Sequence, residues 1–141
     1  MKKALLILIL ALVLVPIGCV QDTIRNYMDQ MLGAHIVDYK ITLVGDPGLD
    51  FSGRYTVVTP VYDPQTQNLA FNYDVYSVEG QIPPAGYMVY AAHDAIAVAG
   101  SFQKRTADWT EFSIELWQGT DLIQQDETTD PYGMVMAAGI K

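Results

Sequence analysis

The amino-acid sequence predicts an all-β fold: a single immunoglobulin-like antiparallel β-sandwich of seven or eight strands, preceded by a signal peptide and a short helical spacer. From Ile36 onward, apolar and polar residues alternate with a period of two, which is typical of strands with one buried face. Turn-forming residues separate these runs, and no helical pattern lies between them. Short strands in direct succession favour two antiparallel sheets packed face to face.

The first three strands are predicted from alternating apolar residues. The first strand covers residues 39–43 and ends at the Asp-Pro-Gly turn of residues 46–48. The second begins at Phe51 and is expected to end at Pro60, because proline cannot donate a hydrogen bond to a strand ladder. A turn follows at residues 63–66. The apolar residues of a longer third strand are Leu69, Phe71, Tyr73 and Val75.

The middle of the chain is more apolar. Residues 81–86 form a proline-containing loop, and two apolar runs follow at residues 87–92 and 95–103. Their low polarity predicts strands that are buried on both faces, with Ala-rich helices as the alternative. The polar pair His93-Asp94 separates the two runs and predicts a break between them.

The last third again has clear strand patterns. Residues 112–116 alternate between apolar and polar, and residues 118–121 make a tight turn. Residues 122–128 are polar at most positions, as is typical of a strand at the edge of a sheet. A second turn at residues 130–133 leads into a terminal apolar strand at residues 134–140.

The N-terminus has the three parts of a secretory signal. Lys2 and Lys3 precede an uninterrupted apolar run at residues 4–15, and small residues follow it. Cys19, the only cysteine in the sequence, comes directly after Gly18. The last five of these residues, 15–19, resemble the lipobox of prokaryotic lipoprotein precursors, with proline at the position where leucine is usual.

The resemblance to a lipobox implies that Cys19 is lipidated. In that family the thiol is joined to diacylglycerol and the signal is cleaved before the cysteine, so that acyl chains hold the protein on a membrane. We therefore expect a signal peptide at residues 1–18, a lipidated N-terminus with a spacer helix at 19–35, and a β-sandwich domain at 36–141. The expected location is extracytoplasmic and membrane-anchored, at the cell surface or the periplasmic face. An uncleaved membrane helix over residues 4–20 and an inert buried thiol are the alternatives.

The spacer is predicted to be helical because its apolar residues recur at the spacing of one helical face. Asp22 is a suitable residue to begin this helix, and Gly33 to end it. The apolar positions are Ile24, Met28, Met31 and Leu32. A short spacer helix packed on the domain is one interpretation, because tertiary packing usually stabilises so short a helix, and a partner-binding helix is the other.

The charge of the chain is strongly negative. Sixteen Asp and Glu residues stand against eight Lys and Arg residues, which gives a formal charge of −8. Removal of residues 1–18 deletes two lysines and no acid, so the mature chain would carry 6 − 16 = −10. Phosphate binding needs a basic surface, and this charge therefore argues against a nucleic-acid partner. The single cysteine also excludes an intramolecular disulfide, so packing must hold the domain together.

A second family pattern lies in the strand region. It consists of Ile114-Glu115-Leu116, a Gly-containing turn, Glu127-Thr128-Thr129 and a final apolar strand, with Pro83-Pro84 in an earlier loop. In this arrangement residues 37–141 resemble the MmpS family of small membrane-anchored β-sandwich proteins. Members of that family are partners of multi-spanning lipid exporters, so the resemblance implies an accessory role without catalysis. This chain departs from the family in lacking paired cysteines in the domain.

The sequence contains no pattern typical of an enzyme or a metal site. It has no G-x-S-x-G motif and no phosphate-binding glycine loop, and neither His35 nor His93 belongs to a zinc-ligand pattern. His93 and Asp94 would pair only in a turn, because neighbours on a strand point to opposite faces, and we interpret His93 as a loop residue without a catalytic role. We expect no catalytic residue, no metal and no cofactor. A calcium site is the alternative to solvated turn residues for three acids, Asp126, Glu127 and Asp130.

Large aromatic residues are the remaining candidates for binding. There are more of them than an inward alternation can bury, and exposed rings stack on sugars or dock proteins. The candidate ligand-binding residues are Trp109, Trp117, Tyr62 and Tyr76. Burial of most of these rings in the sandwich core is the alternative. The sequence therefore predicts a non-enzymatic extracytoplasmic lipoprotein, a cell-surface binding or accessory module of unknown ligand, for which a protein and a glycan are the candidate partners. A carbohydrate-binding module and an accessory subunit of a membrane lipid exporter are the alternative functions.

Overall fold

The computed structural model describes residues 26, 30 and 36–140. Asn26 and Gln30 are helical and exposed. The apolar positions of the predicted spacer helix, the predicted signal peptide and Cys19 lie outside the described residues. The chain divides into two units between His35 and Ile36, and each unit is described by itself.

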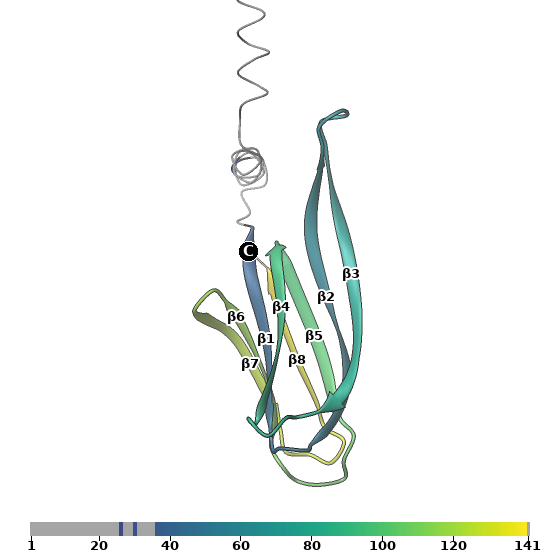
Figure 1. Cartoon of the computed structure of the whole chain (residues 1–141), viewed down its shortest axis with the longest axis vertical. Helices are drawn as coiled ribbons and strands as arrows, with labels where there is room; N and C mark the ends of the chain where they lie inside the picture. The colour runs from purple at the N-terminus through teal and green to yellow at the C-terminus, as the bar shows by residue number, and fades with distance from the viewer. Residues whose placement is uncertain (1–25, 27–29, 31–35, 141) are drawn as a thin grey trace, which may run out of the picture. The chain divides into compact units, whose positions relative to one another are not determined.

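Residues 36–140 form eight strands in two four-stranded antiparallel sheets (Figure 1). Sheet A has the strand order β4-β1-β6-β7, and sheet B has the order β3-β2-β5-β8. The predicted β-sandwich of seven or eight strands is therefore confirmed. The strands are β1 (Val37–Gly45), β2 (Asp50–Asp63), β3 (Asn68–Gln81), β4 (Tyr87–Ala95), β5 (Ala97–Lys104), β6 (Phe112–Gln118), β7 (Asp121–Thr128) and β8 (Met134–Ile140).

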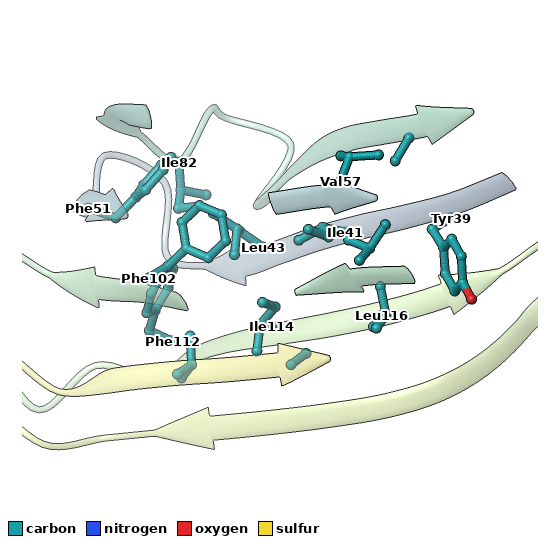
Figure 2. Packing of buried hydrophobic residues seen from close by; sticks show 14 of the residues in the cluster. Tyr39, Ile41, Leu43, Phe51, Val57, Ile82, Phe102, Phe112, Ile114 and Leu116 are labelled. Carbon is teal, nitrogen blue, oxygen red and sulfur yellow. The ribbon is translucent and has the colours of Figure 1, made fainter. Parts of the chain in front are cut away.

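The core lies between the two sheets and is built from alternate residues of the strands. Phe51 of sheet B stacks on Phe112 of sheet A, with ring centroids 6.1 Å apart, and meets Phe102 edge-on at 6.3 Å. Such aromatic pairs contribute beyond the area that they bury. Figure 2 shows further side chains of this cluster, which include Tyr39, Ile41, Leu43, Ile114 and Leu116. The alternation predicted for residues 39–43 and 112–116 is thus confirmed.

β2 continues through Pro60 to Asp63, so the prediction that Pro60 ends the strand is wrong. The carbonyl oxygen of Val58 accepts a 2.9 Å hydrogen bond from the backbone amide of Ile96, which places the polar groups of Val58 on the β5 side. The backbone polar groups of successive strand residues point to opposite sides, so the nitrogen of Pro60, two residues after Val58, also points to the β5 side. β5 pairs with β2 only as far as Val58, so Pro60 costs no ladder bond.

The prediction that the two apolar runs are buried on both faces is also wrong. β5 buries one face only: Val98 is buried and the neighbouring Ala99 is exposed. The outward positions are apolar for two reasons: β5 carries small alanines there, whereas β4 exposes the larger side chains of Tyr87 and Val89. The break between them falls at Ile96, and both His93 and Asp94 belong to β4. His93 is therefore a strand residue and not the loop residue that the sequence suggested.

β3 forms as predicted, but its apolar row faces away from the core. Val57 is buried and pairs with Asp74, so the inward position at this point of β3 is polar. Tyr73 lies opposite Val58 on the outward face, and its side chain is 66% exposed. The β2–β3 hairpin projects beyond the neighbouring strands (Figure 1), and it therefore extends past the part of the sandwich that covers the inner face.

Candidate functional site on the outer face of sheet B

The outward residues of sheet B form a face with a floor of small side chains. Alternation places Arg54 on this face, because Phe51 and Val57 of the same strand point into the core. Arg54 pairs with Ser77 of β3 on one side and with Ser101 of β5 on the other. The rest of the floor, over β5 and β8, consists of Ala97, Ala99 and Ala138.

Larger apolar side chains stand on the two outer strands of the same face. β3 carries them on one edge of the sheet and β8 on the other, so the floor lies between two apolar borders. All of these side chains are exposed. The border residues are Tyr73 and Val75 on β3, and Met134, Met136 and Ile140 on β8.

Three depressions cover this face and share lining residues. The first, of about 620 Å³, has hydroxyl groups from Ser52, Ser77 and Ser101, and its rim carries Glu79, whose carboxylate pairs with Arg105 at 3.3 Å. The second, of about 310 Å³, contains Arg54 as the first does, and it is bordered by Met136. A third, of about 230 Å³, is apolar and lies over alanines and Ile140. The face thus has a polar half and an apolar half, with the Arg54 guanidinium between them. We call this surface, from Ser52 to Ile140, the sheet B groove.

Arg54 is the cation of the sheet B groove. Residues 36–140 contain four Lys or Arg residues, and three of them are engaged elsewhere. Lys40 lies over an indole ring, and Lys104 and Arg105 each pair with a carboxylate. Within the described part of the chain, no ion pair of 4.0 Å or less joins Arg54 to a carboxylate. Its charge is therefore open to an anionic ligand.

The four aromatic residues predicted to bind a ligand do not come together. Tyr62 lies near the tip of the β2–β3 hairpin, and Trp109 lies in the loop after β5. Tyr76 is on the inward face of β3, where its ring stacks on Tyr55 at 4.8 Å. Trp117 is on the outer face of sheet A, whereas the sheet B groove is on the other outer face of the sandwich. The structure therefore places these rings on four separate surfaces.

Lys104 fixes the loop that carries Trp109. Its side chain is fully buried, and Nζ donates to the carbonyl oxygens of Asp108 at 2.9 Å and Thr110 at 2.6 Å. The same nitrogen lies 3.0 Å from Asp108 Oδ1. Hydrogen bonds from the Thr110 side chain, and then from Lys104, hold the pKa of Asp108 well below its ordinary value. Trp109 lies between these two anchored residues and is 73% exposed, so its ring is held out on a fixed loop.

Trp117 is held by contacts within the outer face of sheet A. The Lys40 ammonium lies 4.8 Å from the centroid of the indole ring, which is a cation–π distance. The indole nitrogen donates a 2.9 Å hydrogen bond to Glu115 Oε2. One ring face and the ring nitrogen are therefore already engaged, which leaves less of Trp117 for stacking on a ligand.

His93 interacts with an acid from another strand rather than with its neighbour. Nδ1 of His93 lies 3.4 Å from Asp38 Oδ1, and the backbone amide of Asp94 donates to that same oxygen at 3.1 Å. All three residues are exposed. Asp94 has a φ of 53°, a left-handed conformation that Asp tolerates better than most residues. The contact joins the end of β4 to the start of β1.

Metal-binding clusters and membrane-spanning helices are both missing from the described residues. Over the described residues, there is no group of three or more His, Cys, Asp or Glu side chains that could hold a metal ion. Asp126, one of the three acids considered for calcium, accepts hydrogen bonds from the backbone amides of Glu127 and Met136. Within the same described set, no helix is both long enough and apolar enough to cross a bilayer.

Comparisons with known proteins found similarity to a solved structure but not to a family model or a curated protein. No protein-family model matches the chain, and no curated protein matches it either. Among solved structures, a domain of unknown function, DUF4425, from Bacteroides vulgatus is similar over 74% of this chain and 96% of that chain. The sequence identity is 10% and the TM-score is 0.44.

The sequence did not predict the sheet B groove, because the border strand β8 is apolar on both faces and the apolar row of the border strand β3 is typical of a buried face. The terminal strand reads Met-Val-Met-Ala-Ala-Gly-Ile, and period-two alternation does not say which of its faces is buried. One signal was present. A strand in a two-layer sandwich turns one face outward, so a strand that is apolar on both faces must expose apolar side chains. In the terminal strand these exposed side chains include Met134 and Met136.

Proposed function

We propose that this chain is an extracytoplasmic, lipid-anchored binding module that acts without catalysis through the sheet B groove. The observation that carries the proposal is the position of Arg54, an exposed cation that no ion pair among the described residues joins to a carboxylate, between a hydroxyl-rich and an apolar half of one face. A chain with sixteen acids and eight bases offers few such positions. The groove suits an elongated amphiphile that has an apolar portion and one acidic group.

The floor, the borders and the polar groups of the sheet B groove each support this ligand class. The alanine floor lets an apolar chain approach the backbone closely, while Tyr73 and Met136 on either border add contact area. The guanidinium of Arg54 would form charge-assisted hydrogen bonds with a carboxylate or phosphate oxygen. Ser77 and Ser101 flank Arg54 and supply hydroxyl groups beside that oxygen. Each half of the ligand therefore meets matching chemistry.

Binding is tested by titrating the protein with dodecanoate and with dodecanol while backbone amide shifts are recorded. We expect the shifts to map to β2, β5 and β8, and dodecanoate to bind more tightly. Arg54→Gln should weaken dodecanoate binding roughly 10-fold to 100-fold, the value of a hydrogen bond to a charged group, and leave dodecanol unaffected. Lys40→Gln, on the outer face of sheet A, is the matched control. Shifts confined to sheet A, or equal binding of both probes, would contradict the proposed ligand class.

The lipid anchor is tested by intact mass of the protein made in its native host. The charged start, the apolar run and Cys19 after Gly18 support lipidation. Wild-type protein should lack residues 1–18 and carry acyl mass, whereas Cys19→Ala should carry no acyl mass and leave the membrane fraction. An unmodified wild-type chain that retains residues 1–18 would refute the anchor and leave the groove experiment unaffected.

A carbohydrate-binding module is the second candidate function, and Trp109 favours it. This ring is largely exposed and rests on the loop fixed by Lys104, which lowers the conformational entropy lost on stacking against a sugar. Binding on a glycan array that is lost in Trp109→Ala and kept in Trp117→Ala would support it. An accessory role beside a lipid exporter, implied by the resemblance to the MmpS family, predicts co-purification with a multi-spanning membrane protein.

A further inference from the structure

We propose that a second copy of this chain pairs with the free edge of β3, antiparallel to it, so that two sheet B layers join into one eight-stranded sheet. This inference goes beyond ligand binding in the sheet B groove, because it concerns the edge of the sheet and not its face. It rests on three observations: the geometry of the β3 edge, the protection of the other sheet edges, and the sequence of β3 itself.

The free edge of β3 presents a straight row of backbone hydrogen-bonding groups. β3 is terminal in sheet B, and its fourteen residues pair with β2 without a register shift. Val58 directs its polar groups toward β5, and Tyr73 lies opposite Val58. The amide and carbonyl of Tyr73 therefore point away from β2, and the same holds for every second residue of β3, including Phe71 and Val75. A long, regular and apolar edge of this kind is a template for pairing with another strand.

The other edges of the sandwich have features that hinder pairing with another strand. β8, at the opposite edge of sheet B, has its amides at Met136 and Ala138 bonded to side chains of β7 at 2.8 and 2.7 Å. Sheet A has two edges, β4 and β7, which are nine and eight residues long, and a register irregularity interrupts the ladder of each. β3 carries neither device, and none of its residues is proline or lysine. It is therefore the edge best suited to pairing among the described strands.

The sequence of β3 is complementary to itself when the two-fold axis passes through Tyr73. Residue numbers of facing residues then add to 146, so Phe71 faces Val75 of the second copy and Asn72 faces Asp74 of the second copy. No carboxylate faces another, whereas an axis through Asp74 would set two carboxylates opposite each other, which is destabilising. The amide of Asn72 already bonds the Asp74 carboxylate within one strand at 3.0 Å, so this pair is chemically suited to meet across strands. The aromatic row Phe71 and Tyr73 becomes continuous over both copies.

Cross-linking in native membranes tests the pairing on the full chain. Facing residues of a hydrogen-bonded antiparallel pair have Cα atoms about 5.5 Å apart, within the range of a disulfide. Tyr73→Cys should therefore give a covalent dimer on mild oxidation. Met136→Cys, an exposed border residue of the same face on β8, is the matched control and should stay monomeric. Both variants keep Cys19, so the wild-type protein gives the level of any cross-link through that thiol, and this level is subtracted from both variants.

A second variant tests whether the cross-link depends on pairing of the two β3 strands or arises from random collision of two copies. The Val75 amide points to the free edge, so Val75→Pro removes a bond to the second copy and no bond to β2. Combined with Tyr73→Cys, it should abolish the dimer while the circular dichroism spectrum is unchanged. Equal cross-linking of Tyr73→Cys and Met136→Cys would overturn the proposal. A dimer that persists in the folded Tyr73→Cys, Val75→Pro variant would overturn it as well.

Discussion

The backbone amide of Met136 donates a 2.8 Å hydrogen bond to the Asp126 carboxylate, and this bond joins the edge strands of the two sheets. Two positions along, the amide of Ala138 donates to Gln124 Oε1 at 2.7 Å. Side chains of β7 thus take the place of a neighbouring strand for β8. This explains why the inward positions of β7 are polar, although the corresponding positions of β6 are buried and apolar.

Replacement of Asp126 should destabilise the domain and expose the β8 edge. Asp126→Ala leaves the Met136 amide without its acceptor, and we expect a loss of about 1–2 kcal/mol in the free energy of unfolding. Gln125→Ala, on the outward face of the same strand, is the control and should change the free energy by less than about 0.5 kcal/mol. Urea unfolding measures the difference. Equal effects of the two variants would show that the edge contact is not stabilising.

Loss of the Lys104 amine should be more costly than loss of any exposed cation. Lys104→Met keeps most of the volume but removes two hydrogen bonds to carbonyl oxygens and the ion pair with Asp108. We expect a loss of about 3–6 kcal/mol, because each of the two hydrogen bonds to this charged group contributes about 1.5–3 kcal/mol. Arg105→Met, the neighbouring exposed cation, should cost under about 1 kcal/mol. Thermal unfolding of both variants at equal pH compares them, and similar losses would refute the structural role of Lys104.

The Asp108 carboxylate should make stability fall in acid. Its pKa in the folded protein lies well below the ordinary 3.8, because Thr110 and then Lys104 donate to it. Between those two pKa values the unfolded chain binds a proton that the folded chain does not, so the stabilisation present above pH 3.8 is lost as the pH falls below it. Asp108→Asn should be less stable at neutral pH, and its deficit should shrink in acid. A deficit that is constant from pH 7 to strongly acidic pH would contradict this assignment.

Gly53 should not tolerate a side chain, whereas Gly80 should. A Cβ added to Gly53 would lie within 2.6 Å of the Phe102 ring and even nearer the Ser101 carbonyl oxygen. A Cβ added to Gly80 would meet nothing nearer than the Phe51 ring at 3.8 Å. Gly53→Ala is expected to cost about 1–3 kcal/mol through overpacking. Gly80→Ala, one strand away, should be close to neutral. Calorimetric melting of the two variants measures the difference in stability. A Gly53→Ala variant as stable as the wild type would show that β2 and β5 can separate locally.

The sequence by itself determined the strands, most of the turns and the identity of the core. Phe112, Ile114 and Leu116 are fully buried as their alternation predicts, because a period of two sends every second side chain to one face. The turn at Asp46-Pro47-Gly48 also formed, with Gly48 at a φ of 86°. These features depend on neighbours along the chain, and local pattern is enough to specify them.

Only the tertiary structure decided which face of a strand is buried. Leu69, Phe71, Tyr73 and Val75 form a regular apolar row, yet they face outward, because Val57 and Tyr55 of β2 fix the inner side of sheet B. Arg54 came to lie in the sheet B groove through the pairing of β2 with β3 and β5, which are distant in sequence at that point. Alternation fixes two faces of a strand but not their surroundings. Those surroundings depend on which strands neighbour each other, and on where the opposite sheet ends.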